Sequence, residues 1–488
     1  MNEPSLADRL AGAVWGHLVG DAVGVPYEGQ GPRPPEHVQF GASGSHGKPP
    51  GTWSDDGALM LALLDSLLEK GFGTTDQARH ALAWYRDGAY TPDGEGRFDV
   101  GNATAAALQA IERGTPPEKA GAPDAAGNGS LMRILPLALV ERDIPAAQLV
   151  DRAHRASRVT HGHRVADVAC ALYALVARRL LGGEAGRPRA LADARTELRE
   201  LYRSNWSADH LAALDHLEGY TERGGRGRVW DSFWSAWDAF AGADSYADTV
   251  RRAVAYGNDT DTTAAICGGL AGIHWGIDGI PADWLAGMRG KRLVWPLVGR
   301  LLRSAEYSTD DIRVDWVDLA RVPGLRAASG RLGMTFLPGK RSPGIAGPHW
   351  RALEADVMWL REQHAVDTFL LLVEDHELER ARVRDIAGAM AGYGIDLLRH
   401  PITDGGVPID AHRFRQTLTD VERRLEAGKS VAVACMGGLG RTGTAVACIL
   451  RDAGLGADEA IALTREARPG TLENDDQEAF VRRWPGQP

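Results

Sequence analysis

The chain has 488 residues, more than one hydrophobic core usually supports, so at least two domains are expected. Its formal net charge is -10, with acidic and basic side chains interspersed, which argues against a general affinity for nucleic-acid backbones or anionic membranes. An anionic ligand would therefore need a local basic site or a metal ion.

The spacing of the cysteines and the N-terminal residues indicate the cellular compartment. The four cysteines, Cys170, Cys267, Cys435 and Cys448, lack the spacing of a zinc site or a disulfide framework, which predicts a reducing cytoplasm. The N-terminus has no basic leader, and Asp21 interrupts its apolar stretch, so no signal peptide is expected. No uncharged apolar run reaches the length that spans a membrane.

The first part of the chain, residues 1–310, is predicted to be an all-α domain. Apolar residues recur there at helical spacing, as in LMLALLDSLLEKG and DVACALYALVARRLLGG. Several predicted helices end at glycine, as at Gly71, Gly114 and Gly182. Segments rich in glycine and proline, such as GVPYEGQGPRPPEH, predict long loops that can carry a site.

Two groups of acidic and hydroxyl residues each open an apolar helical run in this domain. They are GTWSDDGALM, with Ser54, Asp55 and Asp56, and GNDTDTTAAICGG, with Asp259, Asp261 and Thr262. One such group would be interpreted as helix capping. Two groups supply the oxygen ligands that Mg²⁺ or Mn²⁺ prefers, without the histidine or cysteine that favours zinc. Because converging carboxylates raise one another's pKa, the sequence predicts a two-metal site if the helices meet.

The helical period is lost between about residues 305 and 348, where glycine and proline are frequent. The domain boundary is placed near residues 310–325, which leaves residues 311–488 for a second domain. Beyond the boundary, helices are predicted at 349–363, 376–391, 410–427 and after 442, and strands at 367–373, 395–398 and 431–434. This alternation predicts an α/β domain with a central parallel sheet.

The segment VAVACMGGLGRTG predicts a phosphate-binding loop. Cys435 directly follows a predicted strand, and Arg441 lies six positions later at the start of a helix. The intervening glycines, Gly437, Gly438 and Gly440, allow backbone N–H groups to turn inward, and the helix N-terminus adds a positive field. This field suits a phosphate dianion and favours a thiolate that attacks phosphorus, while the guanidinium grips the phosphate oxygens.

Two further residues complete the predicted phosphatase chemistry. Thr442 could hydrogen-bond the sulfur and help it to leave in the second step. Asp404, in the loop HPITDGGVP after a predicted strand, is the candidate general acid for the leaving group. The alternative interpretation of Cys435 is a buried structural thiol, a common role for a lone cysteine on an apolar strand.

Residues 325–485 resemble the protein tyrosine and dual-specificity phosphatases, most closely the family of cyclin-dependent kinase inhibitor 3. The similarity rests on LGMTFLPGKR, HPITDGGVP, CMGGLGRTG and ENDDQ. The resemblance implies that Cys435 is the nucleophile and that Gln477 positions the hydrolytic water. The chain departs from the family at Ala434, where a histidine that helps to tune the thiolate normally stands.

Residues 5–300 resemble the ADP-ribosylglycohydrolase family. Six signatures occur in family order: GAVWGHLVGDAVGVPYEG, SDD, GNATAAAL, GNGSLMRILPLAL, THGH and NDTDTTAAICGGLAG. The resemblance implies that the acidic groups bind two magnesium ions, with Ser54 replacing the usual threonine, and that Glu28 faces the ribose. It also implies that His161 contacts the ligand, although a capping role and the neighbouring His163 compete with this assignment. The implied ADP-ribose cleft is lined by Asn128, Gly129, Ser130 and Met132.

Together these observations predict a bifunctional hydrolase. The first domain would use metal-activated water to release ADP-ribose from a protein or small-molecule conjugate, with Asp55 or Glu28 as the proton acceptor. The second would hydrolyse a phosphorylated protein or another phosphomonoester. The two activities could process one ligand in sequence or act independently. The alternative is a scaffold that binds ADP-ribose or phosphate ligands and whose phosphatase half is weak or inactive.

Overall fold

The structure is a computed structural model that describes residues 3–183, 186–309, 311–344 and 347–486. It divides into two compact units, residues 1–305 and 306–488, which are taken separately below. Among the helices in these ranges, none combines the length and the apolar character that a bilayer span requires.

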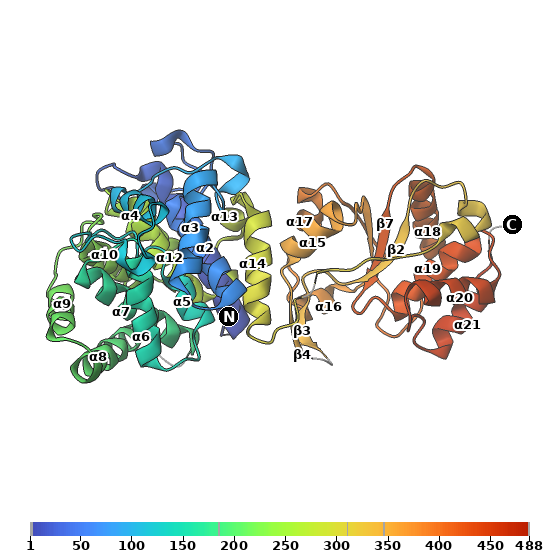
Figure 1. The fold of residues 1–488 in the computed structure, drawn as a ribbon. Helices are drawn as coiled ribbons and strands as arrows, with labels where there is room; N and C mark the ends of the chain where they lie inside the picture. Colours follow the sequence, from blue (N-terminus) through green and yellow to red (C-terminus); the bar gives the residue numbers. More distant parts are fainter. Residues whose placement is uncertain (1–2, 184–185, 310, 345–346, 487–488) are drawn as a thin grey trace. The chain divides into compact units, whose positions relative to one another are not determined.

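The first unit is helical, as predicted (Figure 1). Its α-helices are α1 Leu6–Gly24, α2 Asp55–Lys70, α3 Thr74–Asp87, α4 Asn102–Glu112, α5 Leu135–Val140, α6 Ala146–Arg158, α7 Arg164–Leu181, α8 Arg187–Asn205, α9 Ala208–Glu218, α10 Val229–Ala241, α11 Tyr246–Ala255, α12 Thr260–Trp275, α13 Ala282–Gly287 and α14 Lys291–Arg303. Short 3₁₀ turns occur in several of the loops between them.

Helices α1 and α12 pack backbone against backbone in the core of the first unit. A Cβ atom added at Gly12 would lie 2.2 Å from the carbonyl oxygen of Gly272, so only glycine fits. Glycines four residues apart on α1 form a smooth stripe that permits this approach. At the end of the stripe, a Cβ atom on Gly24 would lie 2.4 Å from Cα of Asp261. The packing therefore fixes the acidic start of α12 beside the end of α1.

Helix α6 buries a histidine that is neutral in the folded chain. His154 is 1% exposed, and its Nε2 lies 2.8 Å from the hydroxyl of Tyr202. Burial, and then electrostatic repulsion by neighbours that include Arg158 and Arg164, lower the pKa of His154 well below the ordinary value of 6.5. The unfolded chain therefore binds a proton at His154 more readily than the folded chain does.

We expect His154 to make the chain less stable as the pH falls below about 6.5. Its contribution is fully present above the unfolded pKa and is lost as the pH falls toward the lower folded pKa, by at most about 1.4 kcal/mol per pH unit. The variant His154→Phe should show a shallower dependence of Tm on pH between about pH 7.5 and 5.5, measured by calorimetry. The substitution leaves the Tyr202 hydroxyl without its His154 partner, which changes Tm at every pH in this range. The slope of Tm against pH is therefore the quantity to compare, and an unchanged slope would contradict the prediction.

The second unit has a central sheet with strand order β1-β2-β7-β5-β6. The predicted strands are present as β5 Thr368–Leu371, β6 Asp396–Arg399 and β7 Val431–Cys435, and they are parallel, as expected. A further parallel strand, β2 Leu332–Phe336, pairs with β7 and was not predicted. The edge strand β1 Asp315–Trp316 is antiparallel to β2, so the sheet is mixed. A separate hairpin pairs β3 Arg341–Gly344 with β4 Gly347–Trp350. The helices are α15 Leu353–Glu362, α16 Asp375–Arg380, α17 Ile386–Gly392, α18 Ala411–Glu426, α19 Gly440–Asp452, α20 Ala457–Ala467 and α21 Asp475–Arg483.

Two predicted helices of this unit differ in the structure. The helix expected at 349–363 begins only at Leu353, because β4 occupies the preceding residues. The single helix expected at 376–391 is two helices, since Arg382 and Asp385 have positive φ angles of 57° and 47°. Asp385 accepts a hydrogen bond from the N–H of Gly388 at 2.9 Å and so caps the second helix.

Candidate active sites

The two acidic groups of the first unit meet at the N-termini of α2 and α12. The hydroxyl of Thr262 donates to Oδ2 of Asp56 at 3.2 Å, across 206 positions of sequence. The side-chain amide of Asn128 donates to Oδ2 of Asp259 at 2.8 Å. The helices therefore bring together the residues that form the acidic cluster, namely Ser54, Asp55, Asp56, Asp259, Asp261 and Thr262.

Asp21 of α1 holds the start of α2 in this arrangement. Its carboxylate accepts hydrogen bonds from the backbone N–H groups of Ser54 at 2.9 Å and Gly57 at 2.8 Å. Burial raises the pKa of Asp21 to about 7. Sequence reasoning missed this role, because Asp21 was considered only as an interruption of the apolar N-terminus. A charged residue within a run of small and apolar helical residues was the available signal.

The charges that act most strongly on the buried aspartates of the acidic cluster are those of other carboxylates. Burial, followed by repulsion from Asp99, raises the pKa of Asp55 well above its ordinary value. Burial and repulsion from Asp56 do the same for Asp261. Oδ1 of Asp56 and Oδ2 of Asp261 are buried without a hydrogen-bond partner among the described residues. Orphaned oxygens in a buried, purely oxygen-donating cluster fit divalent cations.

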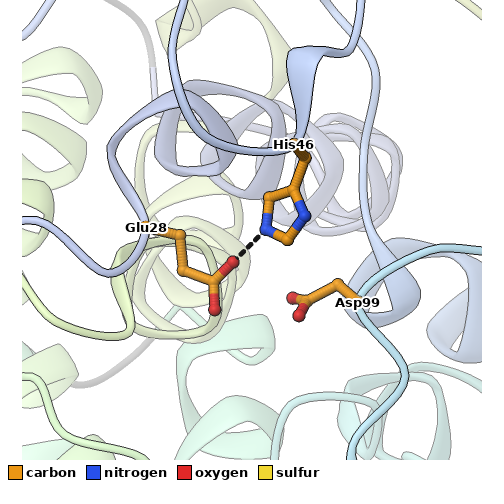
Figure 2. A group of neighbouring side chains, drawn as sticks. All are labelled: Glu28, His46 and Asp99. Atoms are coloured by element: carbon orange, nitrogen blue, oxygen red, sulfur yellow. Dashed lines mark hydrogen bonds and ion pairs between the residues drawn. The ribbon is translucent and has the colours of Figure 1, made fainter.

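Glu28 connects this cluster to a second group of side chains, and Figure 2 shows this second group, Glu28 with His46 and Asp99. Carboxylate oxygens of Glu28, Asp259 and Asp261 lie within 4.8 Å of one another. Glu28 also pairs with Nε2 of His46, and Asp99 lies beside that pair. Burial, and then the charge of Asp99, raise the pKa of Glu28. The hydrogen bond to His46 acts in the opposite direction and lowers this pKa.

Sequence reasoning missed both His46 and Asp99. Their φ angles are 67° and 55°, a region that non-glycine residues seldom adopt and that recurs at functional sites. Neither lies in a motif whose spacing predicts the contact, so only the folded loops bring them to Glu28.

His161 packs against the glycine-rich segment that was predicted to line the ADP-ribose cleft. A Cβ atom on Gly129 would lie 2.7 Å from Cε1 of His161, so the ring fills the space beside this glycine. The ring is 3% exposed, and burial lowers the pKa of His161 to about 3, so the imidazole is neutral. His163 instead caps α7 by accepting the N–H of Val165 at 3.2 Å.

The predicted cleft residues differ in how they are placed. Asn128 contacts the acidic cluster through Asp259. The hydroxyl of Ser130 is buried and accepts a hydrogen bond from Ser157 at 2.8 Å, so it belongs to the packed interior. Met132 is also buried, with 4% exposure.

In the second unit, residues 435–441 lead from the end of β7 into the start of α19. They are the predicted phosphate-binding loop and are called the phosphate loop below. Cys435 is the last residue of β7 and is 4% exposed. Gly438 has a φ of 73°, and a Cβ atom there would lie 2.3 Å from the carbonyl oxygen of Thr335. A Cβ atom on Gly440 would lie 2.7 Å from Nε2 of Gln477. The glycines therefore allow the loop to pack closely against β2 and α21, while Gly437 lines a cavity discussed below.

Arg441 is held by a buried ion pair. Its guanidinium donates two hydrogen bonds to Glu377 of α16, at 2.7 and 2.9 Å, and one to Oδ1 of Asp404 at 2.8 Å. Although burial opposes it, hydrogen bonding from Arg441 holds the pKa of Glu377 below its ordinary value. The pair with Glu377 fixes the orientation of the guanidinium, and the separate hydrogen bond to Asp404 places the predicted general acid beside it. Glu377 was missed because only the fold distinguishes it from other helical acids.

Two predicted residues offer unpaired polar atoms at the loop. Oγ1 of Thr442 and Nε2 of Gln477 are buried without a hydrogen-bond partner in the described part of the chain. The other amide atom of Gln477, Oε1, accepts the N–H of Glu473 at 2.8 Å, which orients the side chain. Such orphaned donors suit a bound ligand or water. Ala434 lies inside the sheet, between Thr335 and Leu371.

Comparisons with known proteins match both units. The model of the ADP-ribosylglycohydrolase family matches residues 2–310, and that of cyclin-dependent kinase inhibitor 3 matches residues 304–459. ADP-ribosylarginine hydrolase Tri1 of Pseudomonas putida (strain GB-1) is 30% identical over 57% of this chain and 73% of its own. Cyclin-dependent kinase inhibitor 3 of Rattus norvegicus is 30% identical over 30% of this chain and 66% of its own. A solved ADP-ribosylglycohydrolase-related protein complex is 33% identical, with a TM-score of 0.52, over 62% of this chain and 99% of that one. Both resemblances found in the sequence are confirmed.

Proposed function

The chain belongs to the ADP-ribosylglycohydrolase family, and we propose that its first unit hydrolyses an ADP-ribose conjugate in a reaction that requires two Mg²⁺ ions. The observation that carries the proposal is the convergence of α2 and α12, which leaves buried oxygens of Asp56 and Asp261 without partners. Mn²⁺, another cation that prefers oxygen ligands, could replace Mg²⁺. The proposed ligands are Ser54, Asp55, Asp56, Asp259, Asp261 and Thr262.

The bound ions would supply Lewis acidity and an activated water for attack at the anomeric carbon of ADP-ribose. Glu28 is the preferred proton acceptor, because it lies within 4.8 Å of the oxygens of Asp259 and Asp261 but is not needed as a ligand. Asp55 is the alternative acceptor, although metal binding would engage its carboxylate. His46 would hold the carboxylate of Glu28 in place through their hydrogen bond.

Asn128, Gly129 and His161 would line the ADP-ribose cleft. The absence of a side chain at Gly129 leaves room for the neutral His161 ring, and Asn128 links the segment to the acidic cluster. Ser130 and Met132 would support the cleft from the interior, since both are buried. The relative named ADP-ribosylarginine hydrolase supports an arginine-linked conjugate as the substrate.

The test is mass spectrometry of the chain incubated with ADP-ribosylarginine, ADP-ribosylserine and ADP-ribose phosphates, with Mg²⁺ and after chelation with EDTA. We expect free ADP-ribose from the arginine conjugate with Mg²⁺ and almost none after chelation. If the metal-loaded chain releases no ADP-ribose from any conjugate, the hydrolase proposal fails, and a ligand-binding scaffold becomes the better account.

We propose that the second unit hydrolyses phosphomonoesters through a covalent intermediate on Cys435. The thiolate forms a sulfur–phosphorus bond while the ester oxygen leaves with a proton from Asp404. Water held by Gln477 then attacks phosphorus and gives its proton to Asp404, and the released thiolate is hydrogen-bonded by Thr442. The products are the alcohol and inorganic phosphate.

Arg441 would bind the phosphoryl oxygens throughout this reaction, with Glu377 as its positioning residue. The observation that supports the proposal is the hydrogen bond between Arg441 and Asp404, which places an acid beside the phosphate loop. Ala434 is the feature that favours the alternative, a phosphate-binding unit with slow or absent turnover.

A further inference from the structure

A cavity of about 420 Å³ lies beside the phosphate loop of the second unit. Its wall is rich in basic side chains, although the whole chain has a net charge of -10. This basic cavity is lined, among others, by Arg313, Lys340, His349, Arg351, Gly437 and Arg468. The concentration of positive charge indicates an anionic ligand.

The pairing of β2 with β7 places the basic cavity next to Cys435. Phe336, another residue of the wall, is the direct partner of Cys435 in the sheet. Gly437 belongs both to the phosphate loop and to the wall, and its carbonyl accepts a hydrogen bond from Arg468 at 3.1 Å. A ligand whose phosphate occupies the loop can therefore extend into the basic cavity.

Part of the basic charge is already balanced within the unit. Arg351 forms a buried ion pair with Asp356, at 2.6 and 2.8 Å. Arg313 and Arg468 share a single carboxylate, that of Asp315. Among the described residues, Arg313 and Arg468 therefore have one ion-pair partner between them.

Lys340 differs in its contacts from the arginines of the basic cavity. It is half-buried, and it forms no hydrogen bond or ion pair with the described residues. Burial, and then the charge of Arg351, lower the pKa of Lys340, while the nearby Cys435 opposes this shift. Asp311 on the same wall offsets one charge, yet the cavity remains net positive. A bound anion would stabilise the charged form of Lys340.

We propose that the basic cavity binds a second phosphate or diphosphate of the substrate, with Lys340 as its principal contact. The inference rests on the proposed phosphomonoester hydrolysis and narrows its substrate to small molecules that carry a scissile phosphate and another phosphate nearby. The cavity volume, about 420 Å³, lies in the range that small-molecule sites occupy.

The test compares adenosine 3′,5′-bisphosphate with adenosine 3′-monophosphate as substrates of the full chain, measured as kcat/KM for phosphate release. We expect the bisphosphate to be preferred by about tenfold or more, the value of a charge-assisted hydrogen bond. Lys340→Gln should abolish the preference, and Lys340→Arg should keep most of it. Lys429→Gln, the same change at an exposed lysine before β7, serves as the matched control.

Three results would overturn the inference: no preference in the wild type, an equal loss on both nucleotides in Lys340→Gln, or a Lys340-dependent preference for an acidic phosphopeptide only. Release of phosphate from para-nitrophenyl phosphate tests the proposed hydrolysis separately. If that release is absent, the basic cavity is tested by measuring, with calorimetry, how tightly the bisphosphate binds to the Cys435→Ser chain. Binding weakened about tenfold by Lys340→Gln would support the basic cavity, and unaltered binding would reject it.

Discussion

Asp261→Ala is expected to reduce Mg²⁺-dependent release of ADP-ribose by roughly a thousandfold, since a metal ion supplies several kcal/mol of transition-state stabilisation. Asp261 lies in the first turn of α12, and its Oδ2 is buried without a partner among the described residues. Substitution by alanine would remove one of the proposed metal ligands. The measurement is the rate of ADP-ribose release at saturating Mg²⁺, followed by mass spectrometry.

The Tm, measured with and without Mg²⁺, distinguishes a variant that has lost metal binding from one that has lost its fold. Mg²⁺ should raise the Tm of the wild-type chain, because a ligand that binds only the folded state stabilises it. In Asp261→Ala this Mg²⁺-dependent rise should shrink. The metal-free variant should be as stable as the metal-free wild type or more so, since burial and repulsion from Asp56 already disfavour the Asp261 carboxylate.

Asp209→Ala is the matched control for this experiment. Asp209 is an exposed acid in the first turn of α9, so the substitution removes a helix N-terminal carboxylate outside the acidic cluster. It should keep both the activity and the Mg²⁺-dependent rise in Tm. Undiminished ADP-ribose release by Asp261→Ala, or by the wild type after EDTA treatment, would refute the two-metal proposal.

The parts of both sites that could be predicted are those whose signal lies within a few residues. Ser54, Asp55 and Asp56 stand together at a helix start, and Cys435 and Arg441 frame a single loop. Their chemistry follows from local spacing and from the element that each segment opens or ends. The sequence also predicted the helical first unit and the alternation of the second, because their periodicities extend over many residues.

The parts that could not be predicted depend on contacts between distant segments. Glu377 pairs with Arg441 across 64 positions, and Asp21 meets Ser54 across 33. Neither contact has a motif, because Glu377 and Asp21 are ordinary helical residues until the fold brings them to their partners. Strand β2, which lies between β1 and β7, was also missed, since Gly333 lies within its five residues and glycine weakens the strand signal.

The two proposed activities share one feature of their ligands. ADP-ribose contains a diphosphate, which is the kind of group that the basic cavity of the second unit is proposed to bind. A phosphorylated ADP-ribose derivative would therefore present suitable groups to both units. This shared chemistry favours sequential processing over two independent reactions.

Cys435→Ser is expected to reduce phosphate release by at least about a thousandfold, because a serine hydroxyl is a far weaker nucleophile than a cysteine sulfur and forms the covalent intermediate poorly. Cys435 is 4% exposed at the end of β7, and serine is similar in size, so the loop geometry should persist. Phosphate binding through Arg441 should then remain within about threefold of the wild type, a difference of under 1 kcal/mol. Steady-state release from para-nitrophenyl phosphate measures the loss, and calorimetry with inorganic phosphate measures the binding.

Cys448→Ser distinguishes a nucleophile from a structural thiol. Cys448 is buried inside α19, and burial raises the pKa of its thiol well above the ordinary value, so it cannot act as a thiolate. Its substitution should lower Tm while phosphate release per folded molecule stays near that of the wild type, because the hydroxyl is placed in an apolar interior. If Cys435→Ser and the wild type release phosphate at the same low rate and bind it equally well, Cys435 is no nucleophile. The missing histidine at position 434 would then mark a phosphate-binding unit rather than an enzyme.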